Sequence, residues 1–172
     1  MSAFTAIDFE TADNGRDSAC SVGLARVEGG KIIHTAHRLI RPPRPDIIFT
    51  YIHNISWEDV ENEPAFGAVW PELADFFKGI DFIAAHNAPF DRGVLYACCA
   101  AAGLTPPKEQ FSCTVQLARK ELGIKPATLS NVCSRLDIPL KHHHALSDAE
   151  ACAKIMIRVE QVRAGKTAAG LN

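Results

Sequence analysis

The fold is decided by residues 80–91, which read Ile80-Asp81-Phe82-Ile83-Ala84-Ala85-His86-Asn87-Ala88-Pro89-Phe90-Asp91. The mostly apolar run 80–85 is short and has no alternating polar face, which is typical of a strand buried on both faces of a sheet. Residues 90–102 then show helical spacing and end at Gly103, a residue type that often follows a helix C-terminus. The stretch therefore predicts a buried strand followed by a helix, the repeating unit of a parallel sheet.

The residues before this stretch have the patterns of antiparallel strands. Short apolar or alternating runs cover 3–9, 20–27 and 31–40, and Gly29-Gly30 is a hairpin turn signal between the last two. The proline-rich segment 41–45 marks a loop, because proline cannot donate a hydrogen bond within a sheet. We therefore expect three antiparallel strands to precede the parallel unit.

Helical patterns dominate the remainder of the chain. They cover 66–77, 114–122, 129–136 and 147–163, and residues 110–113 form a last short strand. Ser56-Trp57-Glu58-Asp59 resembles a capping box that opens a short helix, and Ser147 with Glu150 forms a second box. The prediction is an α/β fold with a mixed five-stranded sheet and helices packed on it. We expect one domain over residues 1–165 and a frayed C-terminal tail over 166–172.

Composition limits the class of protein. The chain has 172 residues, 47% hydrophobic and 22% charged, as expected for a soluble globular domain. Its formal net charge of −2 argues against a protein that grips many phosphates along a duplex, but it permits an enzyme that holds only a strand end. No signal-peptide pattern or membrane-length apolar run is visible, and the six cysteines contain no C-x-x-C pair. We expect a cytoplasmic protein with reduced core cysteines and no membrane contact.

Four acids occupy costly positions beside apolar residues, at predicted strand ends or helix starts: Asp8, Glu10, Asp91 and Asp148. Buried carboxylates are unfavourable unless something positive neutralises them. The period-2 alternation of a strand places Asp8 and Glu10 on one face, and the helix dipole favours Asp148 in a first turn. An all-oxygen ligand set suits Mg²⁺ or Mn²⁺. Together with His143, these acids indicate metal-assisted phosphodiester hydrolysis.

Three motifs, in this order, resemble a known family. Asp8-Phe9-Glu10-Thr11, His86-Asn87-x-x-Phe90-Asp91 and His143-x-Ala145-x-x-Asp148 resemble the three boxes of DEDDh 3′–5′ exonucleases. The sequence is most similar to the proofreading-type exonucleases of the bacterial DNA polymerase III epsilon group, over roughly Phe4 to Val162. One departure is Asn54, where the family usually has glycine; asparagine also tolerates a left-handed backbone. The resemblance implies a ribonuclease H-like fold.

The resemblance also implies roles for individual residues. Two divalent cations, Mg²⁺ or Mn²⁺, would be held by Asp8, Glu10, Asp91 and Asp148. Asp8 would bridge the two ions, and His143 would be the general base. Thr11 would touch the terminal nucleotide, and Phe9 and His86 would line its pocket. The implied activity is hydrolysis of single-stranded or frayed DNA 3′ ends to nucleoside 5′-monophosphates, with a possible contact to a DNA polymerase.

Two alternative functions stay open. An RNA 3′–5′ exonuclease of the ribonuclease T or oligoribonuclease type would share the fold, and fold does not decide substrate. Recognition of a 2′-hydroxyl depends on a few contacts that the sequence does not identify. A non-catalytic module that docks a polymerase would need neither the acids nor His143, so their presence argues against it.

Other polar residues also have more than one interpretation. His142-His143-His144 could be a transition-metal tract, but adjacent residues on an extended loop are expected to point in different directions. We therefore interpret His142 and His144 as solvent or loop-packing residues. Arg38, Arg41 and Arg44 would either contact a nucleic-acid backbone or lie on a solvated loop.

Overall fold

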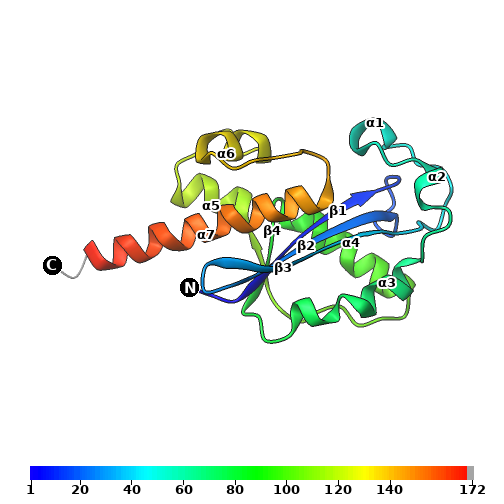
Figure 1. Cartoon of the computed structure of the whole chain (residues 1–172), viewed down its shortest axis with the longest axis horizontal. Helices are drawn as coiled ribbons and strands as arrows, with labels where there is room; N and C mark the ends of the chain where they lie inside the picture. Colours follow the sequence, from blue (N-terminus) through cyan, green and yellow to red (C-terminus); the bar gives the residue numbers. More distant parts are fainter. Residues whose placement is uncertain (170–172) are drawn as a thin grey trace.

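The computed structural model contains one mixed five-stranded sheet with helices on both faces (Figure 1). It describes the backbone of residues 1–169 and the side chains of residues 1–165. The strands are β1 (Phe4–Thr11), β2 (Ala19–Glu28), β3 (Lys31–Leu39), β4 (Phe82–Ala85) and β5 (Phe111–Cys113), in the order β3-β2-β1-β4-β5. The first three pair antiparallel, whereas β4 pairs parallel with β1 and β5. The predicted mixed sheet is confirmed.

The helices follow the predicted patterns with several differences. Their bounds are α1 (Thr50–His53), α2 (Trp57–Val60), α3 (Phe66–Glu72), the 3₁₀ helix η1 (Ala74–Phe77), α4 (Ala88–Ala101), α5 (Thr114–Glu121), α6 (Leu129–Leu136) and α7 (Ala145–Ala169). One helix was predicted over 66–77, but α3 contains Pro71, which lacks an N–H group, and the chain continues as η1. The four-residue α1 is too short to show a periodic pattern. The side chains of the predicted tail, 166–172, lie outside the described residues, and α7 itself continues to Ala169.

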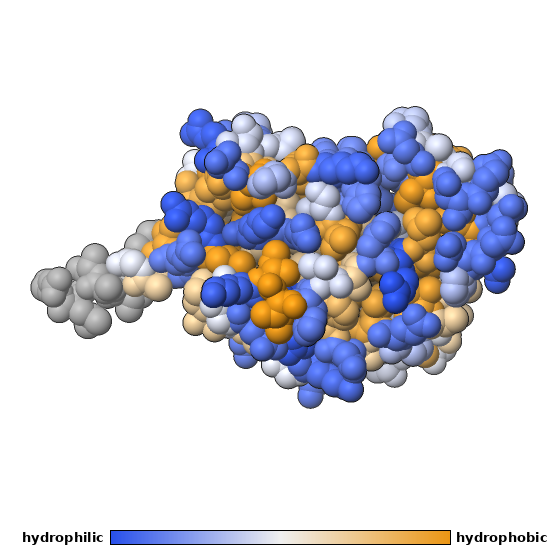
Figure 2. All heavy atoms as spheres, in the orientation of Figure 1, coloured by the Kyte–Doolittle hydropathy of each residue, from blue (hydrophilic) through white to orange (hydrophobic). Residues whose placement is uncertain are grey.

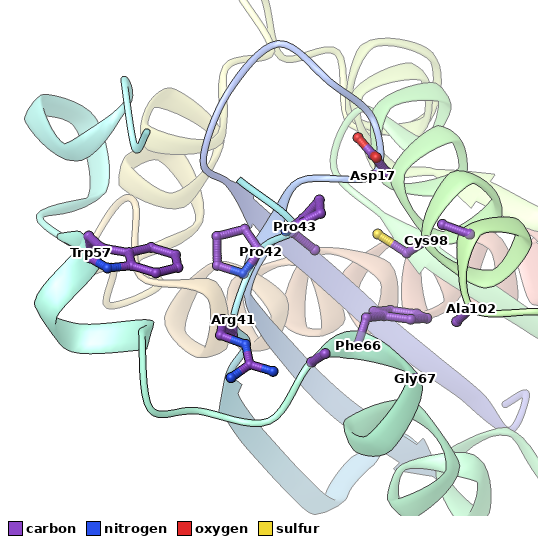
Figure 3. A pocket seen from close by; sticks show the side chains of 12 residues that line it. Asp17, Arg41, Pro42, Pro43, Trp57, Phe66, Gly67, Cys98 and Ala102 are labelled. Carbon is purple, nitrogen blue, oxygen red and sulfur yellow. The ribbon is translucent and has the colours of Figure 1, made fainter. Parts of the chain in front are cut away.

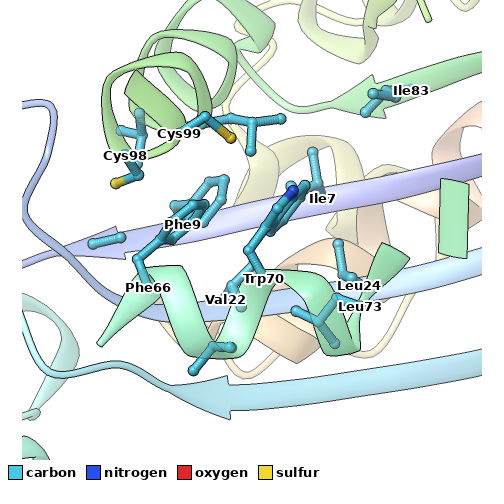
Figure 4. Close-up of a cluster of buried hydrophobic side chains, with 14 of the residues drawn as sticks. Ile7, Phe9, Val22, Leu24, Phe66, Trp70, Leu73, Ile83, Cys98 and Cys99 are labelled. Atoms are coloured by element: carbon cyan, nitrogen blue, oxygen red, sulfur yellow. The ribbon is translucent and has the colours of Figure 1, made fainter. Parts of the chain in front are cut away.

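The hydrophobic core has a part on each face of the sheet. On one face, Phe4 and Ala6 of β1 pack with Met156 of α7. On the other face, Phe9 packs against Trp70 of α3 within the larger cluster (Figure 4). Strand alternation therefore places Asp8 and Glu10 on the face that α7 covers, because they follow Phe4 and Ala6 at intervals of two.

Gly23 determines how closely α7 approaches the sheet. It lies in β2, directly opposite Asp8 of β1. A Cβ atom on Gly23 would collide with the backbone of Ala145 and Leu146, in the first turn of α7. The absence of a side chain at this position lets the start of α7 lie against the strands. Asp148 is consequently brought close to Asp8 and Glu10.

The start of α7 differs from the prediction. Ser147 lies inside the first turn, so the predicted cap by Ser147 and Glu150 is wrong. The Ser147 hydroxyl accepts a hydrogen bond from the Lys141 N–H at 2.8 Å. His144 precedes the helix instead: its carbonyl accepts from the Asp148 N–H at 3.0 Å, and its Nδ1 accepts from the Ser147 N–H at 3.4 Å. The helix begins two residues earlier than predicted, and the capping role passes to a histidine.

Surface and core agree with the composition. The six cysteines are free, and all are buried except the half-buried Cys113, so most of them are core residues as predicted. Figure 2 shows hydrophilic side chains over most of one face, with hydrophobic patches between them. Within residues 1–169, no helix combines the length and the apolar character needed to cross a membrane.

Candidate active site

The predicted acids come together at one end of the sheet. Asp8 and Glu10 of β1 and Asp148 of α7 each offer a carboxylate oxygen, and these oxygens lie within 4.8 Å of one another. Asp91, in the first turn of α4, is 1% exposed, and its Oδ1 accepts a hydrogen bond from the Phe9 N–H at 3.1 Å. Two sequence-distant helices and one strand therefore supply the four acids.

These carboxyl groups resist ionisation. Burial raises the pKa of Asp8 well above its ordinary value, and the charges of Asp91, Asp148 and Glu10 raise it further. Burial likewise raises the pKa of Glu10 to about 7, with a contribution from Asp148, and the pKa of Asp91 to about 8. Like charges in a shielded place favour the protonated form unless a cation is present.

The donor set fits a hard divalent cation. Asp148 Oδ2 accepts hydrogen bonds from His142 Nδ1 at 3.0 Å and from the His143 N–H at 3.1 Å. Its other oxygen, Oδ1, is buried and has no hydrogen-bond partner among the described residues. A buried acceptor without a partner is costly, and a cation beside Asp8 and Glu10 would satisfy it. Carboxylate oxygens without thiolates suit Mg²⁺ or Mn²⁺.

A hollow of about 340 Å³ lies beside the carboxylates. The predicted substrate residues Thr11, Phe9 and His86 all border it. Phe9 is 3% exposed and its ring packs against Trp70, so it supports the wall of the hollow from the core. Three apolar residues of the wall were not among the predicted site residues: Phe49, Ile52 and Leu129.

Two histidines brace this hollow as neutral imidazoles. His86 Nε2 donates to the Ala127 carbonyl at 3.1 Å, its Nδ1 lies 2.9 Å from the Thr114 hydroxyl, and burial lowers its pKa to about 4. His53 Nε2 donates to the Thr11 carbonyl at 3.1 Å, and its Nδ1 accepts from the Ile55 N–H at 3.1 Å. His53 therefore fixes the backbone of Thr11.

The histidine loop differs from the prediction. His143 has a left-handed backbone, with φ of 62°, and its ring stacks on that of His142 with the centroids 3.9 Å apart. Both rings border the hollow, and His142 contacts Asp148. The expectation that adjacent histidines point in different directions is therefore wrong for this pair, because the left-handed residue reverses the chain. His144 does point elsewhere, and its ring packs against that of His37 in β3, with the centroids 4.7 Å apart and the planes tilted by 34°.

A second hollow, of about 540 Å³, has different chemistry. Apolar groups such as Trp57 and Phe66 form most of its lining (Figure 3). Its charged members are Asp17 and Arg41, and the Asp17 carboxylate is already held by Arg44 at 2.6 Å. None of the four clustered acids borders it. The hollow beside the acids is therefore the better candidate for catalysis, although it is the smaller of the two.

Comparisons with known proteins show which family the chain belongs to. The exonuclease family that includes ribonuclease T matches residues 5–156. The chain is 31% identical over 159 residues to DNA polymerase III PolC-type of Thermotoga maritima, covering 90% of this chain and 12% of that protein. It is 30% identical over 164 residues to 3′-5′ exonuclease DinG of Bacillus subtilis, covering 91% and 17%. The chain thus spans only a small part of these relatives.

Solved structures show the same fold. Exonuclease X in complex with 5′ overhanging duplex DNA has a TM-score of 0.75 and 25% identity, over 92% of this chain and 91% of that one. The nuclease domain of 3′hExo, a DEDDh family member bound to rAMP, has a TM-score of 0.78 and 16% identity, over 93% and 92%. The predicted ribonuclease H-like fold is confirmed. With the family match and the arrangement of its acids, the chain belongs to the DEDDh 3′–5′ exonucleases, a family of enzymes that act on nucleic acids.

Proposed function

We propose that this chain is a metal-dependent 3′–5′ exonuclease that releases nucleoside 5′-monophosphates from single-stranded or frayed DNA by a two-metal mechanism. The observation that carries the proposal is the group of Asp8, Glu10 and Asp148, whose oxygens lie within 4.8 Å of one another, beside His143. DNA is favoured over RNA because one relative is a DNA polymerase III and Exonuclease X was solved with a DNA duplex. That similarity also supports a polymerase contact, which stays a prediction.

The acids have separate tasks in this proposal. Asp8, Glu10 and Asp148 would hold one cation, and Asp8 and Asp91 would help to hold a second. Two cations at such a site stabilise both the attacking and the leaving oxygens of the phosphodiester. The raised pKa values of Asp8 and Glu10 agree with this role, since binding a cation favours their ionised form.

His143 would accept the proton of the attacking water. Burial and the neighbouring His142 lower the pKa of His143, although Asp148 opposes them, so the imidazole is neutral and able to accept a proton near neutral pH. Its exposed position on the loop before α7 lets the ring approach the hollow and retreat when product leaves. Thr11, fixed by His53, would contact the terminal nucleotide.

The test is hydrolysis of DNA and RNA strands of one sequence, labelled at the 5′ end. We expect stepwise shortening from the 3′ end and release of nucleoside 5′-monophosphates. Activity should be lost with EDTA and restored by Mg²⁺ or Mn²⁺, and full activity in excess chelator would contradict the metal mechanism. Single-turnover rates should be higher on DNA. Faster hydrolysis of RNA would support the ribonuclease alternative, and no hydrolysis of either strand would support the non-catalytic module.

A closed substrate tests the direction of attack. Circular single-stranded DNA should be cut little, because the hollow bordered by Thr11, Phe9 and His86 is assigned to a strand end. Rapid nicking of the circle would show endonuclease activity and overturn the assignment.

A further inference from the structure

The histidine loop and α7 form a second group of possible metal ligands. Single ligand atoms of His142, His143 and Asp148 lie within 4.8 Å of one another. Both histidines are exposed, whereas Asp148 is 4% exposed and keeps its Oδ1 without a hydrogen-bond partner among the described residues. An ion from solvent can thus reach two imidazoles that lie beside a buried carboxylate, one oxygen of which lacks a hydrogen bond from the described residues.

The chemistry of this group differs from that of the acids on β1. Two imidazoles and one carboxylate suit Zn²⁺ and similar transition-metal cations, whereas oxygen-only sets suit Mg²⁺. Zn²⁺ bonds of about 2 Å would require the three ligand atoms to move closer together. The exposed rings of His142 and His143 can make this movement by side-chain rotation, and His142 Nδ1 already lies 3.0 Å from Asp148 Oδ2.

We propose that His142, His143 and Asp148 form a Zn²⁺ site that is separate from the carboxylate group of Asp8 and Glu10 but shares Asp148 with it. An ion bound there draws Asp148 toward the histidines and occupies the lone pair of the His143 imidazole. Zn²⁺ should therefore inhibit Mg²⁺-dependent hydrolysis, a consequence that rests on the proposed function. His144 is excluded from the site, because its ring packs against that of His37.

Binding is measured first, without nucleic acid. The full chain is titrated with Zn²⁺ in saturating Mg²⁺, with a chromophoric zinc chelator as competitor. His142→Gln removes one ligand from an exposed position, His144→Gln is the matched control on the same loop, and Asp8→Asn alters only the carboxylate group. Loss of a residue that only hydrogen-bonds to a metal ligand typically lowers metal affinity by about 10- to 100-fold. His142 is proposed as a ligand itself, so His142→Gln should weaken Zn²⁺ binding by at least about tenfold.

The controls separate the two possible Zn²⁺ positions. His144→Gln and Asp8→Asn should retain the Zn²⁺ affinity of the unaltered chain. If Asp8→Asn loses Zn²⁺ binding while His142→Gln keeps it, the ion lies among the carboxylates and the proposed site is wrong. Equal affinity in all four proteins, or no Zn²⁺ binding by the unaltered chain, also overturns it. Melting curves without metal verify that each variant is folded.

The activity measurement comes second. The Zn²⁺ concentration that halves the Mg²⁺-supported rate should be at least about tenfold higher for His142→Gln than for His144→Gln, in parallel with the affinities. If the chain binds Zn²⁺ through His142 but hydrolyses no DNA, the proposed function fails and the metal site stands. If it hydrolyses DNA while His142→Gln binds Zn²⁺ like the unaltered chain, only the metal site fails.

Discussion

Two groups of acids near the end of β1 differ in whether the chain itself supplies their positive partner. Arg44 forks between Asp13 at 2.7 Å and Asp17 at 2.6 Å, and its hydrogen bonds are the largest cause of the lowered pKa of both carboxyls. For Asp8 and Glu10, burial is the largest cause and it raises the pKa. A paired group stabilises a loop, whereas an unpaired, shielded group is suited to an external cation. The pairing of Arg44 also favours its structural interpretation over contact with a nucleic-acid backbone.

The largest expected effect is that of Asp8→Asn, which reduces the repulsion within the unpaired group. Activity should fall by roughly a thousandfold or more, at the upper end of what one electrostatic contact contributes to catalysis. The affinity for Mg²⁺ should fall as well. The metal-free chain should melt at the same or a higher temperature, because several acids no longer repel one another as strongly. Single-turnover assays and metal-free melting curves measure the two results.

Asp13→Asn is the matched change in the paired group. It should leave activity near normal and lower the melting temperature slightly, since it weakens a partly exposed ion pair with Arg44. If Asp8→Asn instead melts several degrees lower than the unaltered chain without metal, Asp8 has a structural partner and the contrast between the groups is false.

The second effect concerns His143, the proposed general base on the loop before α7. His143→Ala should slow the chemical step by roughly 10²–10⁴, the usual range for loss of a general base, with little change in Mg²⁺ affinity. In the unaltered chain, the rate should fall as the pH drops and the imidazole becomes protonated. Single-turnover rates against pH at saturating Mg²⁺ measure both effects.

The neighbouring histidines are internal controls for His143→Ala. His144→Ala and His142→Ala should be mild by comparison, although His142 hydrogen-bonds Asp148 and its loss is expected to be the larger of the two. Near-normal rates for His143→Ala combined with a severe loss in either neighbour would assign the base to a different histidine. Fast turnover in all three variants would mean that no histidine acts as the base.

The third effect concerns the contact between Gly23 of β2 and the first turn of α7, which positions Asp148. Gly23→Ala should push the first turn of α7 away from β2 and displace Asp148. A displacement of about 1 Å can reduce catalysis by about a hundredfold, and overpacking costs about 1–3 kcal/mol of stability. Gly165→Ala is the control: Gly165 also lies in α7, and no described atom lies within 4 Å of the added Cβ, so this variant should keep its activity. Equal activity of the two variants would show that Gly23 does not position Asp148.

The predictable parts of the site are those carried by regular structure. Strand alternation placed Asp8 and Glu10 on one face, and the helical pattern placed Asp91 in a first turn. The hydrogen bond between His142 and Asp148 was not predictable, because it depends on the left-handed backbone of His143. The wall residues Phe49 and Leu129 were not predicted for a related reason: contact across the hollow follows from tertiary packing, and no local pattern records it.

The smallest expected effect is the pH dependence of stability, in which the two acid groups act in opposite directions. The pKa values of Glu10 and Asp91 are raised to about 7 and about 8 in the folded chain, so the folded state binds protons more tightly than the unfolded state. The stability they contribute is present at low pH and is lost as the pH rises through these values. The pKa values of Asp13 and Asp17 are lowered, so their contribution is lost only as the pH falls below the ordinary carboxyl range.

Between about pH 7 and pH 8 the paired group stays ionised, and of the two acid groups only the unpaired one titrates. Histidines with a lowered pKa, such as His86, oppose this effect only weakly above pH 7, because the unfolded chain has by then lost most of their protons as well. The melting temperature of the metal-free chain should therefore fall across this range, by roughly 2–4 °C for each kcal/mol lost. Saturating Mg²⁺ should flatten or reverse the slope, because the ion binds the ionised carboxylates and displaces their protons. Calorimetric melting at several pH values, with and without Mg²⁺, measures both slopes. A metal-free melting temperature that rises from pH 7 to pH 8 would show that a cationic group of the protein already neutralises these acids, and the distinction between paired and unpaired groups would then fail.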